Sequence, residues 1–402
     1  MRAAVVGAGF AGLSAADALA RAGVEVVVLE ARDRVGGRVW SRELPNGSVV
    51  EMGAEFILPG EDVILGLVER FGLGLWDKIM RYGDREPRGV GVDRDGVMAA
   101  AATVQRALAE RGDEAARMSV ADFLRGLDID PAAREAMLSR CELSAGNSSE
   151  LVTAEALAHL AAVADDECPS VAGGNQRVAL ALAAELGAAV QLGSPVRRIA
   201  WGEGGVTVAA AGSEVNADAC VVAAPASVLP QIAFEPVLPE QVAAAIRGVV
   251  YGHAAKLFVP LREVPPPSAV ISVPGRYWTW TAGGPGGEVQ PVVSAFVGSA
   301  PALEALNVAR GPSAWLDSVE ELRPDLELEP DGALLSTWDD DPWLAAAYST
   351  RTPAGSTGDL LTEPVGPLVF CGEHTAGEWS GLMEGALRSG LRAAEQVLVA
   401  HR

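Results

Sequence analysis

Three glycines near the start of the chain have the spacing of a phosphate-binding turn. Gly7, Gly9 and Gly12 form the pattern G-x-G-x-x-G, which follows a short apolar run and opens a helical pattern. Glycines at this spacing let the chain turn tightly and bring backbone N–H groups close to a pyrophosphate at a helix N-terminus. The pattern alone is weak evidence in a chain with 45 glycines, so its context must decide the interpretation.

Glu30 and a second glycine turn supply that context. Glu30 ends the next apolar run, where a carboxylate accepts hydrogen bonds from ribose hydroxyls and disfavours a 2′-phosphate. Arg32 follows, and then Gly36, Gly37 and Arg38 offer a second backbone approach and a fixed cation for a diphosphate. The alternative is a surface turn with salt-bridged arginines. Taken together, the two turns favour a dinucleotide site.

Lysine is rare in this chain. Lys78 and Lys256 are the only two among 31 lysines and arginines. A buried lysine can orient a water molecule or move protons, and its charge stabilises a nearby anion. The alternative for Lys256 is a strand lysine whose ammonium group reaches solvent. Its rarity favours a functional role.

The elements that must position these residues alternate between strands and helices. Residues 3–6 and 24–29 are apolar, β-branched runs, and residues 13–22 have helical composition, which predicts a βαβ unit with parallel strands. Residues 103–167 have apolar spacing near the helical period and predict a helical insertion. Further buried strands are expected at 219–223 and 367–371, and a long final helix at 381–399. The predicted fold class is α/β, Rossmann-like, with a second α+β domain.

Composition excludes several classes of function. The net charge is −22 and no basic block is present, which argues against nucleic acid as a partner. No run of about 18 apolar residues or signal peptide stands out, so no membrane anchor is expected. Four cysteines in a long chain suggest reduced thiols and a cytoplasmic location. No metal site is expected, because the four histidines form no ligand pattern: His159, His253, His374 and His401.

Segments at both ends of the chain resemble the flavin amine oxidase superfamily. The first spans residues 7–38, and the next strand and turn follow at 49–57. The flavin signature of that family resembles Gly372-Glu373-His374-Thr375 and the run from Trp379 to Ala386. The segment from Trp338 to Tyr348 is similar to the one that precedes this signature in the family.

The resemblance implies two discontinuous domains with the flavin ring at their junction. The FAD-binding domain would comprise residues 1–78, 168–245 and 338–402, and a substrate domain of sheet and helices residues 79–167 and 246–337. The resemblance further implies that Val196 contacts the adenine, that Glu373 binds the ribityl chain, and that the backbone at Leu382 and Met383 meets the pyrimidine end. Trp338 and Gly372 join this cofactor set. The catalytic residues implied are Lys256, which would hold a water near flavin N5, and the pocket ring Tyr348.

The sequence departs from parts of the family pattern. Ala347 stands where some monoamine oxidases carry the cysteine that attaches the flavin, so we expect non-covalent FAD. Tyr348 matches one of their two pocket rings and Leu382 replaces the other, with Trp379 or Trp338 as candidates to compensate. No arginine follows Gly53-Ala54 to pair a substrate carboxylate. Glu55 stands there instead, where it could face a cationic amine or form a local salt bridge.

The resulting prediction is an FAD-dependent oxidase. An amine would give hydride from its α-carbon to flavin N5, and the imine would hydrolyse while O2 reoxidised the flavin to give H2O2. The alternatives are a flavin-dependent desaturase or dehydrogenase of small-molecule biosynthesis and a non-catalytic binding protein on the same fold. The amine itself stays open, and a homodimer is among the open oligomeric states.

Overall fold

A five-stranded parallel sheet carries the first βαβ unit. The computed structural model describes residues 1–158, 166–284 and 287–401. The order of the sheet is β19-β12-β1-β2-β8, and every neighbouring pair is parallel. Its strands are β1 (Arg2–Val6), β2 (Glu25–Leu29), β8 (Val190–Gln191), β12 (Ala219–Val222) and β19 (Leu368–Phe370). The near-continuous apolar strands predict burial on both faces, and both faces are covered.

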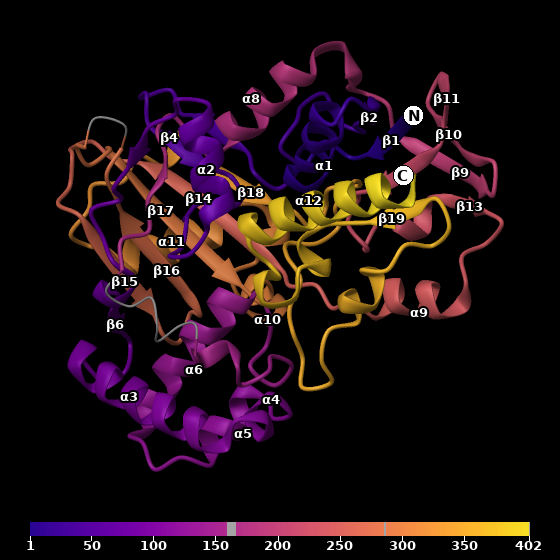
Figure 1. The fold of residues 1–402 in the computed structure, drawn as a ribbon. Helices are drawn as coiled ribbons and strands as arrows, with labels where there is room; N and C mark the ends of the chain where they lie inside the picture. Colours follow the sequence, from indigo (N-terminus) through magenta and orange to yellow (C-terminus); the bar gives the residue numbers. More distant parts are fainter. Residues whose placement is uncertain (159–165, 285–286, 402) are drawn as a thin grey trace.

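One face of this sheet packs against helices and the other against a second sheet. Ala3 and Val5 belong to a core shared with α1 (Phe10–Arg21), α8 (Gln176–Leu186) and α12 (Met383–Ala400). Figure 1 shows α12 lying alongside α1, so the last helix covers the first. The opposite face packs on a four-stranded sheet of order β11-β10-β9-β13. Its strands are β9 (Val196–Gly202), β10 (Gly205–Ala210), β11 (Ser213–Ala217) and β13 (Ala233–Glu235).

A six-stranded sheet forms the other half of the molecule. Its order is β18-β14-β17-β16-β15-β6, antiparallel except between β15 and β6. The strands are β6 (Glu86–Arg88), β14 (Ala254–Pro260), β15 (Ser268–Ser272), β16 (Tyr277–Thr281), β17 (Val292–Gly298) and β18 (Leu334–Thr337). β14 and β16 are buried along their whole length. Side chains therefore alternate between two buried faces of this sheet.

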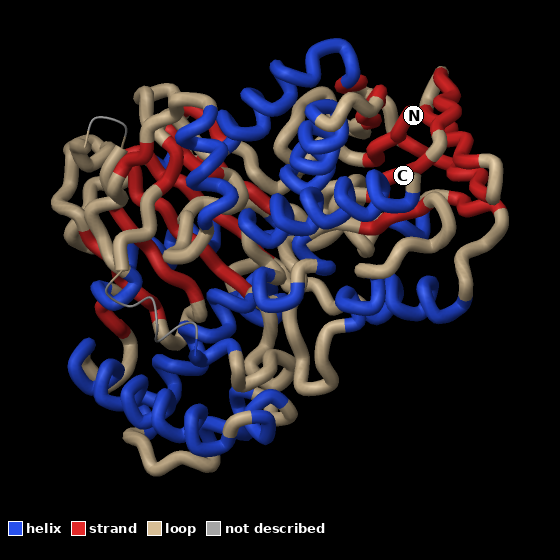
Figure 2. Tube along the Cα trace, viewed as in Figure 1, coloured by secondary structure: helices blue, strands red, loops and turns tan. Residues whose placement is uncertain are grey.

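Helices cover both faces of the six-stranded sheet. Trp278 and Trp280 share a core with the helices at the bottom of Figure 2, whereas Tyr277 packs on Trp315 of the opposite face. The first group is α3 (Arg94–Arg111), α4 (Asp113–Ala116), α5 (Val120–Arg125) and α6 (Pro131–Ala145), and the second is α10 (Ala300–Ala305) and α11 (Ser313–Leu322). The helical insertion expected at 103–167 thus begins earlier, at Arg94, where Asp93 caps the helix. Residues 159–165 of that expectation lie outside the described residues.

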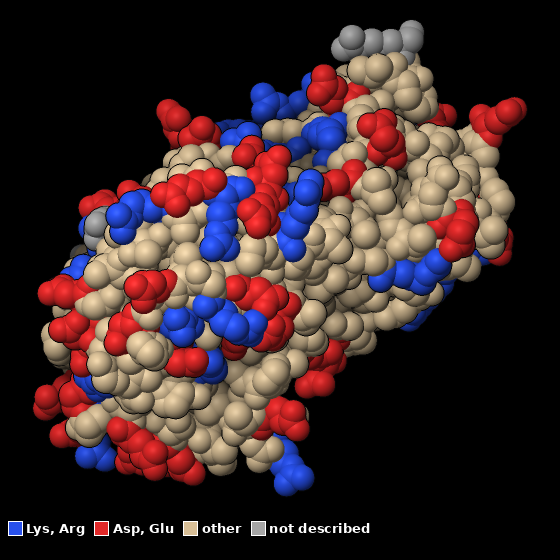
Figure 3. Space-filling model, turned by 90° about the horizontal axis from the view of Figure 1, so that it is seen from below, with Lys and Arg blue, Asp and Glu red and all other residues tan. Residues whose placement is uncertain are grey.

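Shorter elements complete the fold. They are α2 (Asp62–Arg70), α9 (Glu240–Gly248), and the paired strands β3 (Ser41–Glu43) with β4 (Val49–Glu51) and β5 (Leu75–Trp76) with β7 (Ser170–Val171). None of the helices in the described ranges has the length and apolar character needed to cross a bilayer. The surface seen from below carries acidic and basic side chains interspersed (Figure 3).

Candidate functional site

One cavity of about 910 Å³ is lined from both halves of the molecule. The ends of β1 and β2 border it on one side, and side chains of β14 and β16 on the other. It is lined by sixteen of the residues that the sequence singled out: Gly7, Gly9, Glu30, Arg32, Gly36, Gly37, Arg38, Glu55, Val196, Lys256, Trp338, Tyr348, Gly372, Glu373, Leu382 and Met383. Gly12 and Trp379 are not among the lining residues.

The first glycine turn forms a cradle at the start of α1. Gly7 has φ +102°, a conformation that L side chains rarely adopt, and Gly9 precedes the first helical residue, Phe10. Gly12 lies in the first turn of the helix, where an added Cβ would overlap the carbonyl oxygen of Gly7. Because Gly9, Phe10 and Ala11 line the cavity, the N-terminus of α1 faces it with its unpaired N–H groups.

Glu30 and Arg32 close this end of the cavity. One carboxylate oxygen of Glu30 accepts from the backbone N–H of Ala8 at 2.7 Å, and the other accepts from that of Arg32 at 3.0 Å. The Arg32 guanidinium is ion-paired with Asp341 at 2.6 Å. Asp341 was not singled out from the sequence, since only the fold brings it close. The Glu30 carboxylate, which was expected to meet the ribose hydroxyls, is therefore held in place by backbone N–H groups on both sides of it.

Arg38 and Glu373 join the two ends of the chain inside the cavity. Their side chains are 2.7 Å apart, and Arg38 also donates to the carbonyl of Ala347 at 2.7 Å. Glu373 in turn accepts from the backbone N–H of Gly381 at 2.8 Å. Burial would raise the pKa of Glu373, but Arg38 outweighs it and lowers that pKa. A glycine cradle, a helix N-terminus and a cationic side chain fit the two phosphates of a dinucleotide.

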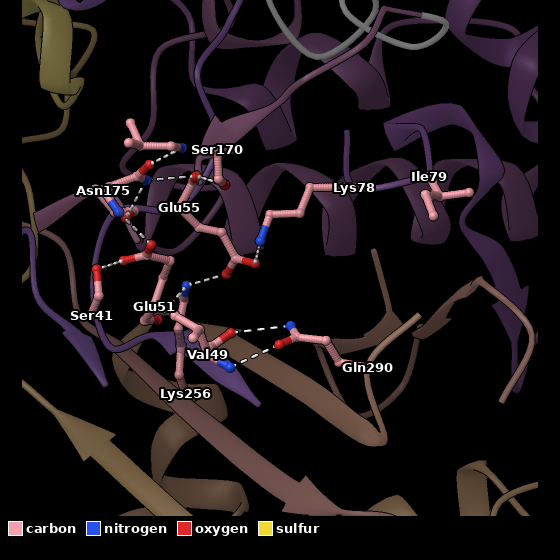
Figure 4. Close-up of polar contacts among 12 residues, drawn as sticks. Ser41, Val49, Glu51, Glu55, Lys78, Ile79, Ser170, Asn175, Lys256 and Gln290 are labelled. Carbon is pink, nitrogen blue, oxygen red and sulfur yellow. Dashed lines mark hydrogen bonds and ion pairs between the residues drawn. The ribbon is translucent and has the colours of Figure 1, made fainter. Parts of the chain in front are cut away.

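Glu55 lies between the only two lysines of the chain (Figure 4). Lys256 Nζ is 2.7 Å from one carboxylate oxygen and Lys78 Nζ is 3.0 Å from the other. Burial would raise the pKa of Glu55, but the two ammonium groups lower it to about 2. Each oxygen thus accepts from one ammonium group, which is the local salt bridge that the sequence allowed for Glu55. Lys78 was not predicted as a partner of Glu55, although its rarity was the available signal.

Four aromatic side chains line the cavity beside the lysine pair, and the sequence did not single them out. Trp278 and Trp280 are stacked with centroids 4.1 Å apart, as residues two apart on a strand allow. Phe56 and Tyr82 face them, with the Phe56 centroid 6.1 Å from that of Trp280 and 5.2 Å from that of Tyr82. All four residues line the cavity. This part of the cavity is suited to an apolar substrate body.

Of the three rings expected around the substrate, Tyr348 and Trp338 line the cavity and Trp379 does not. Tyr348 lines the cavity and its hydroxyl donates to the carbonyl of Ser144 at 3.0 Å. Trp338 also lines it and packs edge-on against Trp40. Trp379, in contrast, is covered by the guanidinium of Arg388, 4.7 Å above its ring.

Within the described residues, no group of three or more His, Cys, Asp and Glu side chains could hold a metal ion. One of the four histidines, His159, lies outside those residues. His374 is buried beside Glu373, where it packs against Tyr251 with ring centroids 6.2 Å apart.

Comparison with known proteins identifies the family. Residues 10–398 match the model for flavin-containing amine oxidoreductases. A Mycobacterium tuberculosis protein designated a flavin-containing monoamine oxidase, AofH, is 30% identical over 453 residues, which cover 98% of this chain and 95% of that protein. Putrescine oxidase of Kocuria rosea is 29% identical, with 98% and 94% covered. A solved structure of putrescine oxidase bound to putrescine has a TM-score of 0.85 at 23% identity over 99% of each chain.

These matches confirm the resemblance and the fold seen in the sequence. The desaturase and the non-catalytic binding protein are not favoured, because the family model and the relatives named above are amine oxidases. The chain is an enzyme that uses a flavin to oxidise amines, and it belongs to the flavin-containing amine oxidoreductase family.

Proposed function

We propose that the cavity binds FAD without a covalent link and oxidises a small-molecule amine at the carbon next to its nitrogen. The observation that carries this proposal is that groups suited to a dinucleotide and groups suited to an amine line the same cavity. The glycine cradle and Arg38 fit the diphosphate, and Lys256 lies in the same cavity beside an aromatic lining. When bound, FAD accepts a hydride from the amine α-carbon and passes the electrons to O2, which gives an imine and H2O2.

The side chains of this protein would prepare that reaction. Lys256 forms an ion pair with Glu55, and its ammonium group would hold a water molecule beside the bound flavin. Tyr348 has its hydroxyl fixed by backbone carbonyls and presents its ring to the amine. The cofactor contacts proposed are those of the cradle, Glu30, Arg32, Val196, Trp338 and the segment around Glu373, Leu382 and Met383. All of them except Gly12 line the cavity.

Non-covalent binding rests on the residue before Tyr348. Ala347 lines the cavity there and offers no atom for a thioether. Acid precipitation tests this: all the yellow colour should appear in the supernatant, and flavin that stays with the pellet would show a covalent link.

The four cysteines are free thiols, which supports a reducing compartment such as the cytoplasm.

We propose the two-domain division given above on the membership of the sheets. The five-stranded sheet takes its strands from residues 2–29, 190–222 and 368–370, and the six-stranded sheet from 86–88 and 254–337. The site then lies at the junction, where closing of one domain on the other would exclude water. A homodimer stays a proposal of the sequence alone.

The function is tested by mixing purified yellow protein with amines in the absence of oxygen. A panel of aryl-alkylamines, diamines and amines that bear a carboxylate covers the main substrate chemistries. The expected result is that one class of amine bleaches the oxidised flavin. Admitting O2 should then restore the yellow colour and form H2O2. If dithionite bleaches the flavin but no amine does, amine oxidation by this protein is wrong.

A further inference from the structure

Arg85 is a buried cation in the cavity wall, and no acidic side chain in the described part of the chain pairs with it. It lies just before β6, its side chain is 7% exposed, and it lines the cavity. Its Nε and Nη1 atoms are buried without a hydrogen-bond acceptor, and no carboxylate pairs with it among the residues that the structure describes. Buried charges are normally paired, because an unpaired one loses its hydration. The unfilled donors of Arg85 therefore point to a ligand.

The groups around Arg85 do not supply the missing negative charge. Among the described residues, the titratable groups that act on it are Arg140, Tyr82 and Cys168. Burial lowers the pKa of Arg85 to about 9, with Arg140 adding repulsion, so the guanidinium stays largely charged at neutral pH. Burial also raises the pKa of Tyr82, and that of Cys168 to about 11, so both are neutral.

The carboxylates that line the cavity are engaged elsewhere, protonated or exposed. Glu55 is shared by the two lysines. Burial raises the pKa of Glu61 to about 8, so it is mostly protonated at neutral pH. Glu155 and Glu378 are exposed to solvent. Glu30 and Glu373 accept from the cofactor-side backbone and arginines. Among the residues that the structure describes, no cavity carboxylate is therefore left to pair with Arg85, which favours an anion supplied by a ligand.

A short aromatic path connects Arg85 to the catalytic lysine. The Arg85 guanidinium lies 3.8 Å from the Trp278 centroid, that ring is 4.1 Å from Trp280, and Lys256 Nζ is 5.7 Å from the Trp280 centroid. Stacking on Trp278 covers a face of the guanidinium and leaves its N–H edge available for hydrogen bonds. A small molecule lying along the tryptophan pair would reach both ends.

We propose that Arg85 binds a carboxylate of the substrate, so that the enzyme oxidises amines that also carry a carboxylate. The inference rests on the proposed function, because it assigns the substrate class of the same cavity. A guanidinium holds a carboxylate through charge-assisted hydrogen bonds, often in pairs. The charge of Arg85 also opposes the second ammonium group of a diamine.

Binding of a matched pair of ligands tests the site without turnover. Phenylpropanoate and phenylpropanamide have the same shape and differ in charge. Each is titrated into the yellow holoenzyme, and binding is followed by calorimetry. The carboxylate should bind at least about tenfold more tightly than the amide, the effect of a charge-assisted hydrogen bond. Equal binding of the two would overturn the proposal.

Variants locate the effect at Arg85. Arg85→Gln should abolish the preference for the carboxylate, and Arg85→Lys should keep part of it. Arg88→Gln is the matched control, because Arg88 lies three residues on, pairs with Glu86 and is not a lining residue. The Arg85→Gln melting temperature should not fall, since an unpaired buried charge is removed. A fall in melting temperature with the preference intact would show a purely structural arginine.

Turnover separates this inference from the proposed function. The experiment compares two matched pairs of amines with and without a carboxylate. Phenylalanine and phenethylamine test an α-amino acid, and aminohexanoate and hexylamine test an ω-amino acid. One carboxylated member should reduce the flavin about 10- to 100-fold more efficiently than its partner, and Arg85→Gln should remove this advantage mainly through KM. Plain amines favoured in both arms would overturn the substrate class. If a carboxylate binds in a way that depends on Arg85 but no amine reduces the flavin, the anion site at Arg85 is supported and amine oxidation is disproved.

Discussion

Lys256 and Lys78 donate to opposite oxygens of one carboxylate, yet only Lys256 lines the cavity. We predict that Lys256→Met lowers the rate of flavin reduction by about 10²- to 10⁴-fold, the usual contribution of a positioned proton-transfer group. Lys78→Met should leave that rate within the same order of magnitude. Each variant leaves Glu55 with one partner, so the two should lose similar stability. Stopped-flow reduction and thermal unfolding measure both, and equal loss of rate would contradict a special role for Lys256.

His374 is buried and its two ring nitrogens have no hydrogen-bond partner among the described residues. Burial lowers its pKa to about 4, against about 6.5 in an unfolded chain. The unfolded state then binds more protons between these values, so this stability is complete above pH 6.5 and is lost as pH falls towards 4. The loss should approach about 3 kcal/mol. His374→Phe should flatten the fall in unfolding free energy over this window, and the exposed His401→Phe should not.

The packing of α12 on α1 depends on a glycine in the last helix. A Cβ at Gly390 would overlap the carbonyl oxygen of Ala11. Gly390→Ala should therefore separate the two helices and destabilise the protein by about 1–3 kcal/mol, the usual cost of overpacking. Gly66→Ala is the matched control, because Gly66 lies in α2 with no atom within 4 Å of its would-be Cβ. There the helix preference should raise stability by about 0.5–1 kcal/mol. Denaturant titration compares the two, and equal losses would contradict this account.

Elements with a local signal were predictable, and contacts between distant elements were not. The βαβ unit follows from its own apolar runs and glycines, and α12 follows from its helical pattern. The ion pair of Lys256 was not foreseeable, because Glu55 follows β4 and Lys78 follows β5, and only the fold brings both beside Lys256 of β14. Arg85 carried no sequence signal, because only the folded structure shows that the described carboxylates lie away from its guanidinium.

The whole molecule carries a formal charge of −22, so its surface repels itself. Added salt screens this repulsion over a length that shrinks from about 30 Å at 0.01 M to about 10 Å at 0.1 M. We predict that the melting temperature rises with sodium chloride over this range, because the compact state holds the charges closest together. Association of a carboxylate ligand with the cavity should also become faster. A falling melting temperature would show that surface ion pairs outweigh the net charge.

The position of α12 against α1 has a consequence for biosynthesis. The part of α1 that packs on α12 stays uncovered until residues 383–400 have been made. β1 likewise waits for β12, more than 200 residues later in the sequence. Contacts of such sequence separation form slowly and leave apolar surface open to aggregation in the meantime. We therefore expect chaperones to bind the nascent amino-terminal segment. A chain that ends before α12 should be degraded by proteases.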